Sequence, residues 1–170
     1  NNNSMTKFLC VRYGNVAWST GSVLPIWKEM HKKNKKIFTT GPHMRRFFFT
    51  IDDAVNLVLF VLKNTNKFSG KIVCADMKSS LIIDVLKVWI KNYGGSYKII
   101  ANRKGDRLDE FLIGSNEIQH AYEVNTKNKI YYVIDFNKKA KNCVNKVISS
   151  KNSKKLNNKE ISKLLKIGMN

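Results

Sequence analysis

Side chains able to hold an anionic or hydroxyl-bearing ligand gather in a few short motifs of this chain. An arginine guanidinium can donate two parallel hydrogen bonds to one anionic group, and an asparagine amide can both donate and accept. A single arginine is more simply explained by an ion pair with a surface acid, so the ordered set matters more than any member. The motifs are Arg12-Tyr-Gly-Asn-Val16, Gly21-Ser-Val-Leu-Pro25, Met44-Arg-Arg-Phe47 and Arg103-Lys-Gly-Asp106.

Other reactive residue types lack catalytic or metal-binding spacing, so no metal site is predicted. The histidines are interpreted as surface or turn residues without ligand spacing: His31, His43 and His120. The cysteines are three, widely spaced and without a Cys-x-x-Cys pair: Cys10, Cys74 and Cys143. They indicate neither a disulfide framework nor a zinc site, and a reducing cytoplasm fits this usage.

Short strands and helices alternate around these motifs. A buried strand of an α/β sheet is expected over Lys7–Asn15, and a short helix with Pro25 in its first turn follows the second motif. Small strands are expected over 37–40 and 46–50. A helix from a cap at Thr50 to about Asn64 is apolar nearly all round, which predicts burial on several sides, and Asp52 and Asp53 fit its cap.

The remaining elements complete an α/β or mixed α+β domain. Strands are expected over 71–74, 97–100 and 129–136, and a second helix capped by Ser80 should end at Tyr93-Gly-Gly95. Helical spacing marks 106–113, with a further turn near Ser115. The predicted division is 1–136 as the main part, 137–157 as a basic linker, and 158–170 as a docking helix.

Composition limits the classes of protein that this chain can be. At 170 residues and 43% hydrophobic content it can bury one ordinary core. Its longest apolar run, Leu57–Leu62, is far too short to cross a bilayer, so no membrane contact is expected. The net charge of +19 would attract polyanions, but its excess lies in a lysine- and asparagine-rich stretch, Lys127–Lys166, with few aromatics. Compositional bias is therefore favoured over a nucleic-acid surface.

Taken in order, the motifs resemble the carboxyl-terminal, substrate-binding half of an extended short-chain dehydrogenase/reductase, of the polysaccharide-biosynthesis UDP-N-acetylglucosamine 4,6-dehydratase or dehydratase/epimerase type. The resemblance covers nearly the whole chain and is weakest over 122–149. It implies the carboxyl-terminal, substrate-binding part of a Rossmann-type enzyme that uses NAD(P) and makes nucleotide sugars for capsule, lipopolysaccharide or glycan synthesis. It departs from the family at Trp18 and Thr20, where relatives carry a small residue and an arginine.

The resemblance assigns roles in binding a UDP-sugar. Arginine suits the diphosphate, aspartate the ribose hydroxyls and asparagine a sugar-phosphate oxygen, while backbone groups would line the nucleobase slot. Tyr13 is expected to face the cofactor. Arg46 and Arg103 are expected to bind the diphosphate, and Arg45 could substitute for one of them. The substrate-binding candidates are Asn15, Ser22, Val23, Pro25, Arg46, Arg103 and Asp106.

The catalytic parts of such an enzyme are absent from the sequence. Its nine glycines form no Gly-x-x-Gly-x-x-Gly loop, and none of its six tyrosines is followed by lysine four residues later. NAD(P) would thus be bound mainly by a missing amino-terminal half, and the chain alone is expected to be catalytically incomplete. The expected partners are a UDP-sugar, that half or a complementary chain, and further copies of this chain.

Two alternatives stay open at this stage. The chain could be a non-catalytic basic module that binds nucleic acid or an anionic glycan through its charge, with the motifs as relics. It could also be an inactive gene fragment. Stabilisation by UDP-N-acetylglucosamine would favour the sugar-nucleotide site, whereas salt-sensitive stabilisation by polyanions alone would favour the basic module.

Overall fold

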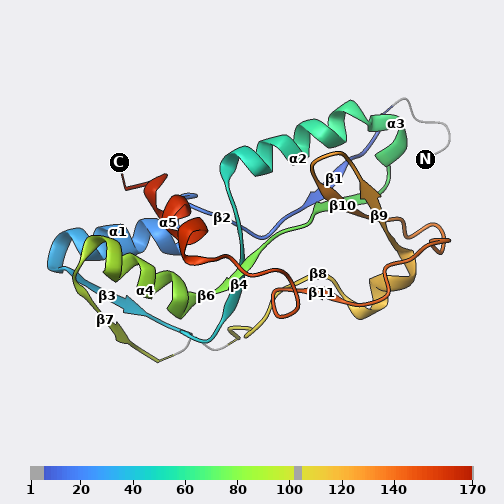
Figure 1. The fold of residues 1–170 in the computed structure, drawn as a ribbon. Helices are drawn as coiled ribbons and strands as arrows, with labels where there is room; N and C mark the ends of the chain where they lie inside the picture. Colours follow the sequence, from blue (N-terminus) through green and yellow to red (C-terminus); the bar gives the residue numbers. More distant parts are fainter. Residues whose placement is uncertain (1–5, 102–104, 170) are drawn as a thin grey trace. The chain divides into compact units, whose positions relative to one another are not determined.

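The computed structural model describes residues 6–101 and 105–169 of the chain (Figure 1). Strands and helices alternate along it, which confirms the predicted mixed α/β class. Two compact units interleave in the sequence. Unit 1 contains the residues up to Tyr13, 52–76 and 111–149, and unit 2 contains 14–51, 77–110 and the residues from Ser150 on. These units do not follow the predicted division at residues 136 and 157.

Unit 1 is built on a four-stranded sheet in the order β1-β5-β10-β9. Its strands are β1 (Cys10–Arg12), β5 (Ile72–Ala75), β9 (Ala121–Asn125) and β10 (Ile130–Ile134). β1 pairs with β5 in parallel, and the other neighbours are antiparallel. β8 (Phe111–Ile113) pairs separately with β11 (Ile148–Ser149), and the 3₁₀ helix η1 (Ser115–His120) leads into β9. The central strands are apolar on both faces, as fully covered strands should be.

Helices α2 (Ile51–Lys63) and α3 (Thr65–Phe68) complete unit 1. The predicted start and end of α2 are confirmed within a residue or two, but its predicted burial on several sides is wrong. Only one stripe is buried, formed by Ala54, Leu57 and Val61. Other apolar residues of the helix, including Val55 and Leu62, are exposed. Hydrophobicity alone could not tell which side of the helix is covered in this chain.

An ion pair links strand β1 to the 3₁₀ helix η1 in unit 1. The Arg12 guanidinium donates to both carboxylate oxygens of Glu117 at 2.8 Å and to the carbonyl of Leu112 at 2.9 Å. Both side chains are less than one-third exposed. Hydrogen bonding from Arg12 holds the pKa of Glu117 below its usual value, despite partial burial, which opposes the shift. Arg12 therefore has a structural partner, the simpler of the two explanations that the sequence allowed.

This pair predicts acid sensitivity of unit 1. Because the pKa of Glu117 is lower in the folded chain, its stabilisation is complete above the unfolded value and is lost as pH falls through the folded value. Glu117→Gln should lower the free energy of unfolding by about 1–3 kcal/mol at pH 7, and it should flatten the loss of stability as pH falls below the ordinary glutamate pKa of about 4.3. Urea unfolding at several pH values measures this, with exposed Glu123→Gln as control. An unchanged pH slope in Glu117→Gln would contradict the assignment.

Unit 2 contains two small sheets and three packed helices. One sheet has the order β2-β4-β6 and the other pairs β3 with β7 in parallel. The strands are β2 (Asn15–Val16), β3 (Lys36–Thr39), β4 (Arg45–Phe49), β6 (Ser79–Leu81) and β7 (Ser96–Ile99). The helices are α1 (Val23–Asn34), α4 (Ile82–Tyr93) and α5 (Asn158–Lys166). Trp27 on α1 and Trp89 on α4 are almost fully buried between them, with Ile161 and Leu165 of α5.

Several local predictions are wrong for identifiable reasons. The single strand expected over Lys7–Asn15 is split into β1 and β2, which belong to different sheets. Gly14 lies at the break, where an added Cβ would stand 2.4 Å from the Cβ of Phe47. The helix expected over 106–113 is a loop followed by β8, and Ser80 lies within β6 rather than at the cap of α4. Pairing with distant strands overrides the local helical spacing in both places.

The carboxyl-terminal region is also more ordered than a linker. Ser149 and Ser150 are buried, and β11 lies within the stretch 137–157. The docking helix is confirmed as α5, whose Asn157 side chain accepts from the Glu160 amide in a capping box. His31, expected at the surface, is 5% exposed, and its Nε2 lies 3.1 Å from the Gly94 carbonyl oxygen. No helix in the described part of the chain has the length and apolarity needed to span a membrane.

Candidate functional site

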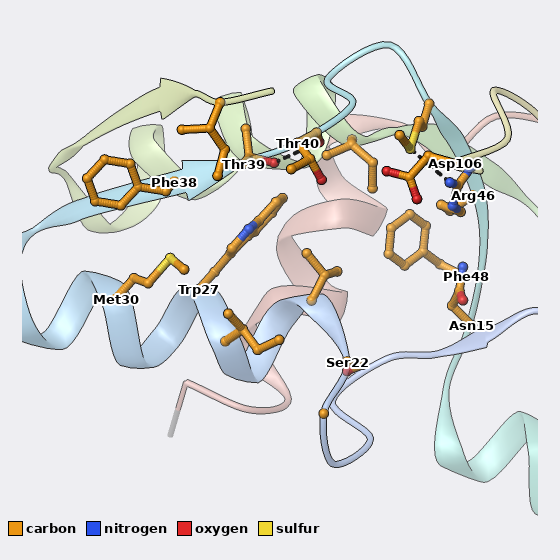
Figure 2. Close-up of a pocket in the computed structure, with 16 residues that line it drawn as sticks. Asn15, Ser22, Trp27, Met30, Phe38, Thr39, Thr40, Arg46, Phe48 and Asp106 are labelled. Atoms are coloured by element: carbon orange, nitrogen blue, oxygen red, sulfur yellow. Dashed lines mark hydrogen bonds between the residues drawn. The ribbon is translucent and has the colours of Figure 1, made fainter. Parts of the chain in front are cut away.

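Unit 2 contains a cavity of about 330 Å³, which lies within the range of small-molecule sites (Figure 2). Helix α1 and strand β3 lie on opposite sides of the cavity, and strand β4 lies at one end, as the positions of Trp27, Phe38 and Phe48 show (Figure 2). The sequence candidates that line it are Asn15, Ser22, Val23, Arg46 and Asp106, together with apolar residues that include Trp27, Phe38, Phe48 and Ile82. Residues up to 91 positions apart, from Asn15 to Asp106, therefore converge on one cavity.

Ser22 presents an unsatisfied hydroxyl at the start of α1. It is the N-cap residue of that helix, but its side chain makes no cap hydrogen bond. Its Oγ is buried and has no hydrogen-bond partner among the described residues. A buried hydroxyl without a partner is costly, so a ligand that supplies one would recover that free energy. The next residue, Val23, opens the helix and lines the same cavity.

Arg46 enters the cavity from β4 with its nitrogens already engaged. Its Nε lies 3.4 Å from the Glu110 carboxylate, and one terminal nitrogen donates to the Arg45 carbonyl at 2.8 Å. The other contacts the Met44 sulfur at 2.9 Å. Its side chain is 17% exposed. An anionic ligand that binds Arg46 must therefore share or replace Glu110, because the guanidinium charge is partly neutralised by that carboxylate.

Glu110 joins the two strands that carry the polar candidates. Its carboxylate accepts from the Asn15 amide at 3.3 Å and from the Phe47 backbone N–H at 3.2 Å, in addition to its contact with Arg46. Asn15 and Phe48 are register partners between β2 and β4. The three donors thus converge on one carboxylate, and two of them, Asn15 and Arg46, also line the cavity. Glu110 was not among the site residues expected from the sequence.

A brace of hydrogen bonds, formed by Ser150 and Lys155, holds the backbone of Glu110 in place. The Ser150 hydroxyl accepts from the Glu110 amide at 2.9 Å, and the Ser150 amide donates to the Glu110 carbonyl at 2.8 Å. Lys155 donates to the Ser150 carbonyl at 2.6 Å and to the Ser79 hydroxyl at 3.1 Å. Burial, with Arg45 nearby, lowers the pKa of Lys155. Sequence analysis missed this brace because it lies in a stretch that is compositionally like a linker.

The other sequence candidates lie elsewhere. Pro25 is in the first turn of α1 but lines a smaller surface hollow with Ile26 and Glu29 rather than this cavity. Tyr13 belongs to unit 1 and is 41% exposed. Arg103 lies outside the described residues. Arg45 is not among the residues that line the cavity, and its guanidinium pairs with Asp109 at 3.2 Å.

The described side chains that line the cavity include no pair suited to acid–base catalysis. Arg46 and Asp106 are its ionisable members, and neither adjoins a histidine, cysteine or tyrosine of the lining. Among the described residues no cluster of histidine, cysteine and carboxylate groups could hold a metal. The opposite end is apolar, with Trp27, Met30 and Phe38 along its wall (Figure 2). The arrangement can bind a ligand that is polar at one end and flat or apolar at the other.

Comparisons with known proteins agree with the motifs. A family of polysaccharide biosynthesis proteins matches residues 1–134. The chain is 38% identical to the uncharacterized membrane protein MJ1061 of Methanocaldococcus jannaschii over 95% of its length and 50% of that protein. It is 34% identical to a UDP-N-acetylglucosamine 4,6-dehydratase (inverting) of Campylobacter jejuni over 78% of its length and 37% of the enzyme. The chain thus spans half or less of these relatives.

The fold has a counterpart among solved structures. The X-ray structure of Pen from Bacillus thuringiensis superimposes with a TM-score of 0.84, covering 99% of this chain and 51% of that one at 24% identity. This supports a fold equivalent to part of an extended short-chain dehydrogenase/reductase. The chain belongs to the polysaccharide biosynthesis protein family.

Proposed function

We propose that unit 2 binds the UDP-sugar substrate of a nucleotide-sugar dehydratase or epimerase, with UDP-N-acetylglucosamine as the first candidate. The observation that carries this proposal is the convergence of Asn15, Ser22 and Arg46 on one cavity of suitable size. The polar end offers an arginine and an amide to phosphate oxygens, while the apolar end accommodates a flat ring. A relative named as a UDP-N-acetylglucosamine 4,6-dehydratase supports the choice of ligand.

Within this proposal the diphosphate binds Arg46 and displaces the Glu110 carboxylate from the guanidinium. Two charge-assisted hydrogen bonds from a guanidinium fork would compensate for the loss of that internal pair. Asp106 would accept from ribose hydroxyls, and the unpartnered Ser22 hydroxyl would contact the nucleobase end. Arg103 is retained as a second phosphate ligand on its sequence motif alone.

The chemistry is assigned to residues outside this chain. Neither the Tyr-x-x-x-Lys pair nor the glycine-rich loop occurs in these 170 residues, so the proton and hydride transfers have no donor or acceptor here. We also propose that the complete enzyme uses NAD(P), that Tyr13 contacts this cofactor and that the protein is cytoplasmic. The bound sugar would then be transformed only when a further segment supplies the cofactor site.

A matched pair of serine variants tests ligand binding. Ser22→Ala removes a buried hydroxyl with no partner, so the unliganded chain should keep or slightly gain stability. Affinity for UDP-N-acetylglucosamine should nevertheless fall about 5- to 10-fold, corresponding to about 1–1.4 kcal/mol. Thermal stabilisation across a ligand titration measures both quantities.

Ser19→Ala is the control, because Ser19 is exposed, bonds only locally to the Val16 carbonyl and lies outside the cavity lining. It should leave affinity unchanged, whereas Arg103→Ala should abolish the ligand-induced shift. Equal affinity of Ser22→Ala and the native chain would oppose the placement of the ligand. Stabilisation by polyanions alone, lost in salt, would support the basic binding module instead.

A further inference from the structure

Trp18 lies in the loop between β2 and α1, in a backbone conformation that bulky residues rarely adopt. Its φ is +67°, and the only other described non-glycine residue with a positive φ is Lys35. Lys35 is the C-cap of α1, where the left-handed conformation is common, whereas Trp18 caps the end of no helix in this way. Residues strained like this persist only where surrounding structure holds them, and they gather at functional sites. Contacts of the Trp18 side chain must therefore compensate for its backbone.

The Trp18 indole is held by the carboxyl-terminal helix of the chain. Its Nε1 donates to the Leu164 carbonyl at 2.8 Å. That carbonyl belongs to the last turn of α5, where carbonyls have no partner within the helix, so the indole satisfies it from outside. The ring also packs beside Trp89 of α4, with ring centroids 6.1 Å apart. One side chain thus ties the loop to two helices of the unit 2 core.

Gly168 lies so close to the indole that it leaves no space for a side chain of its own. A Cβ added at Gly168 would stand 2.1 Å from Cδ2 of Trp18. The φ of Gly168 is outside the left-handed region, so its backbone alone does not require glycine. The Gly168 carbonyl accepts from the Lys28 ammonium group, which ties the same segment to α1. The ring that covers Gly168 therefore explains why glycine is needed there.

The loop that Trp18 anchors joins two segments of the candidate cavity. Asn15 precedes the loop and Ser22 follows it, and both line the cavity (Figure 2). Trp18 is not among the lining residues, so it can act on the cavity only through its neighbours in the chain. Three backbone hydrogen bonds also order the loop. They run from the amides of Ala17, Ser19 and Ser22 to the carbonyls of Phe49, Val16 and Ser19.

We propose that Trp18 is a positioning residue for the candidate ligand site and that α5 acts on the cavity through it. The Trp18 anchor, formed by Trp18, Leu164 and Gly168, holds the loop so that the buried Ser22 hydroxyl stays where a ligand can supply its missing partner. Without the anchor the loop is less ordered, and the entropy of ordering it opposes ligand binding. The inference rests on the proposed function for the identity of the ligand, but not for the ordering of the loop.

Gly168→Ala tests the anchor from outside both the loop and the cavity. The added Cβ should displace the indole, so hydrogen exchange of the Ala17, Ser19 and Ser22 amides should become at least about fivefold faster in the absence of ligand. Affinity for UDP-N-acetylglucosamine, measured by isothermal titration, should fall about 3- to 10-fold because the loop must be ordered on binding.

Trp18→Gly should have the same two effects. Glycine accepts a φ of +67° without strain, so the loss of affinity would follow from the missing indole and not from the backbone. The double variant Trp18→Gly/Gly168→Ala should be no worse than Trp18→Gly alone, because the added Cβ has no ring to displace. Trp18→Phe, which keeps an aromatic ring but loses the N–H donor to Leu164, should give intermediate exchange and affinity.

Ile161→Val is the matched control, because Ile161 is buried on α5 but is not part of the Trp18 anchor. It should lower the Tm by about 2–4 °C and leave loop exchange and affinity unchanged. Unchanged loop exchange in Gly168→Ala, or an additive double variant, would overturn the proposal. So would faster exchange with native affinity, since Trp18 would then be a structural anchor only. A native chain that binds no UDP-sugar would count against the proposed function, whereas the exchange rates judge the anchor without ligand.

Discussion

Arg46→Ala should reduce affinity for UDP-N-acetylglucosamine by at least about tenfold, and it should also destabilise unit 2 by about 1–3 kcal/mol. The loss of affinity follows from removal of the guanidinium that lines the cavity. The loss of stability follows because the half-buried Glu110 carboxylate keeps only its amide donors. Isothermal titration and urea unfolding measure the two effects separately.

Pairing the variant with a change at Glu110 separates its two roles. In Arg46→Ala/Glu110→Gln the unpaired charge is gone, so stability should recover while affinity stays low. Arg46→Lys should bind with intermediate affinity, because an ammonium group cannot supply the two-pronged fork. Native affinity in the double variant would contradict a direct phosphate contact and leave Arg46 as a brace for Glu110.

Trp89→Ala should cost about 3–5 kcal/mol, the largest stability loss expected from a single substitution in unit 2. Trp89 is fully buried, and its ring contacts the rings of Trp18, Trp27 and His31 with centroids about 6 Å apart. Because Trp27 also lines the cavity, a void at Trp89 should weaken ligand binding as well. Urea unfolding, followed by hydrogen exchange in α4, measures the loss and locates it.

Trp89→Phe supplies the control for this cavity effect. The indole N–H of Trp89 is buried without a partner among the described residues, and phenylalanine removes that donor while it keeps most of the aromatic contact. The substitution should therefore cost much less than its change in volume suggests. A cost as large as that of alanine would show that the N–H is satisfied and that the packing account is incomplete.

The sequence predicts the polar members of the cavity better than their partners. Asn15, Ser22 and Arg46 belong to short motifs with recognisable chemistry, and the structure brings them together. Glu110 and Ser150 act through contacts made 40 to 95 residues away. Only the folded chain shows such contacts, because no local spacing records them.

The same limit explains the errors in the fold. Helices α1 and α4 have one clear apolar stripe each, and their positions follow from periodicity. The pattern of α2 is apolar on a wider arc, so the sequence alone could not show that Val55 and Leu62 remain exposed. The apolar spacing of residues 106–113 predicted a helix, but the structure has β8 at the end of this segment, paired with β11. That pairing depends on residues far along the chain, so local spacing could not predict it.

The most direct test of the binding account is an NMR titration of the isotope-labelled chain with UDP-N-acetylglucosamine. Saturable shifts should appear at the amides of Asn15, Ser22, Val23 and Asp106, all of which line the cavity. Added salt should reduce them only modestly, since a built site depends on geometry as well as charge. Shifts confined to the lysine-rich residues 138–166 and lost in salt, or no shifts at millimolar ligand, would contradict the account.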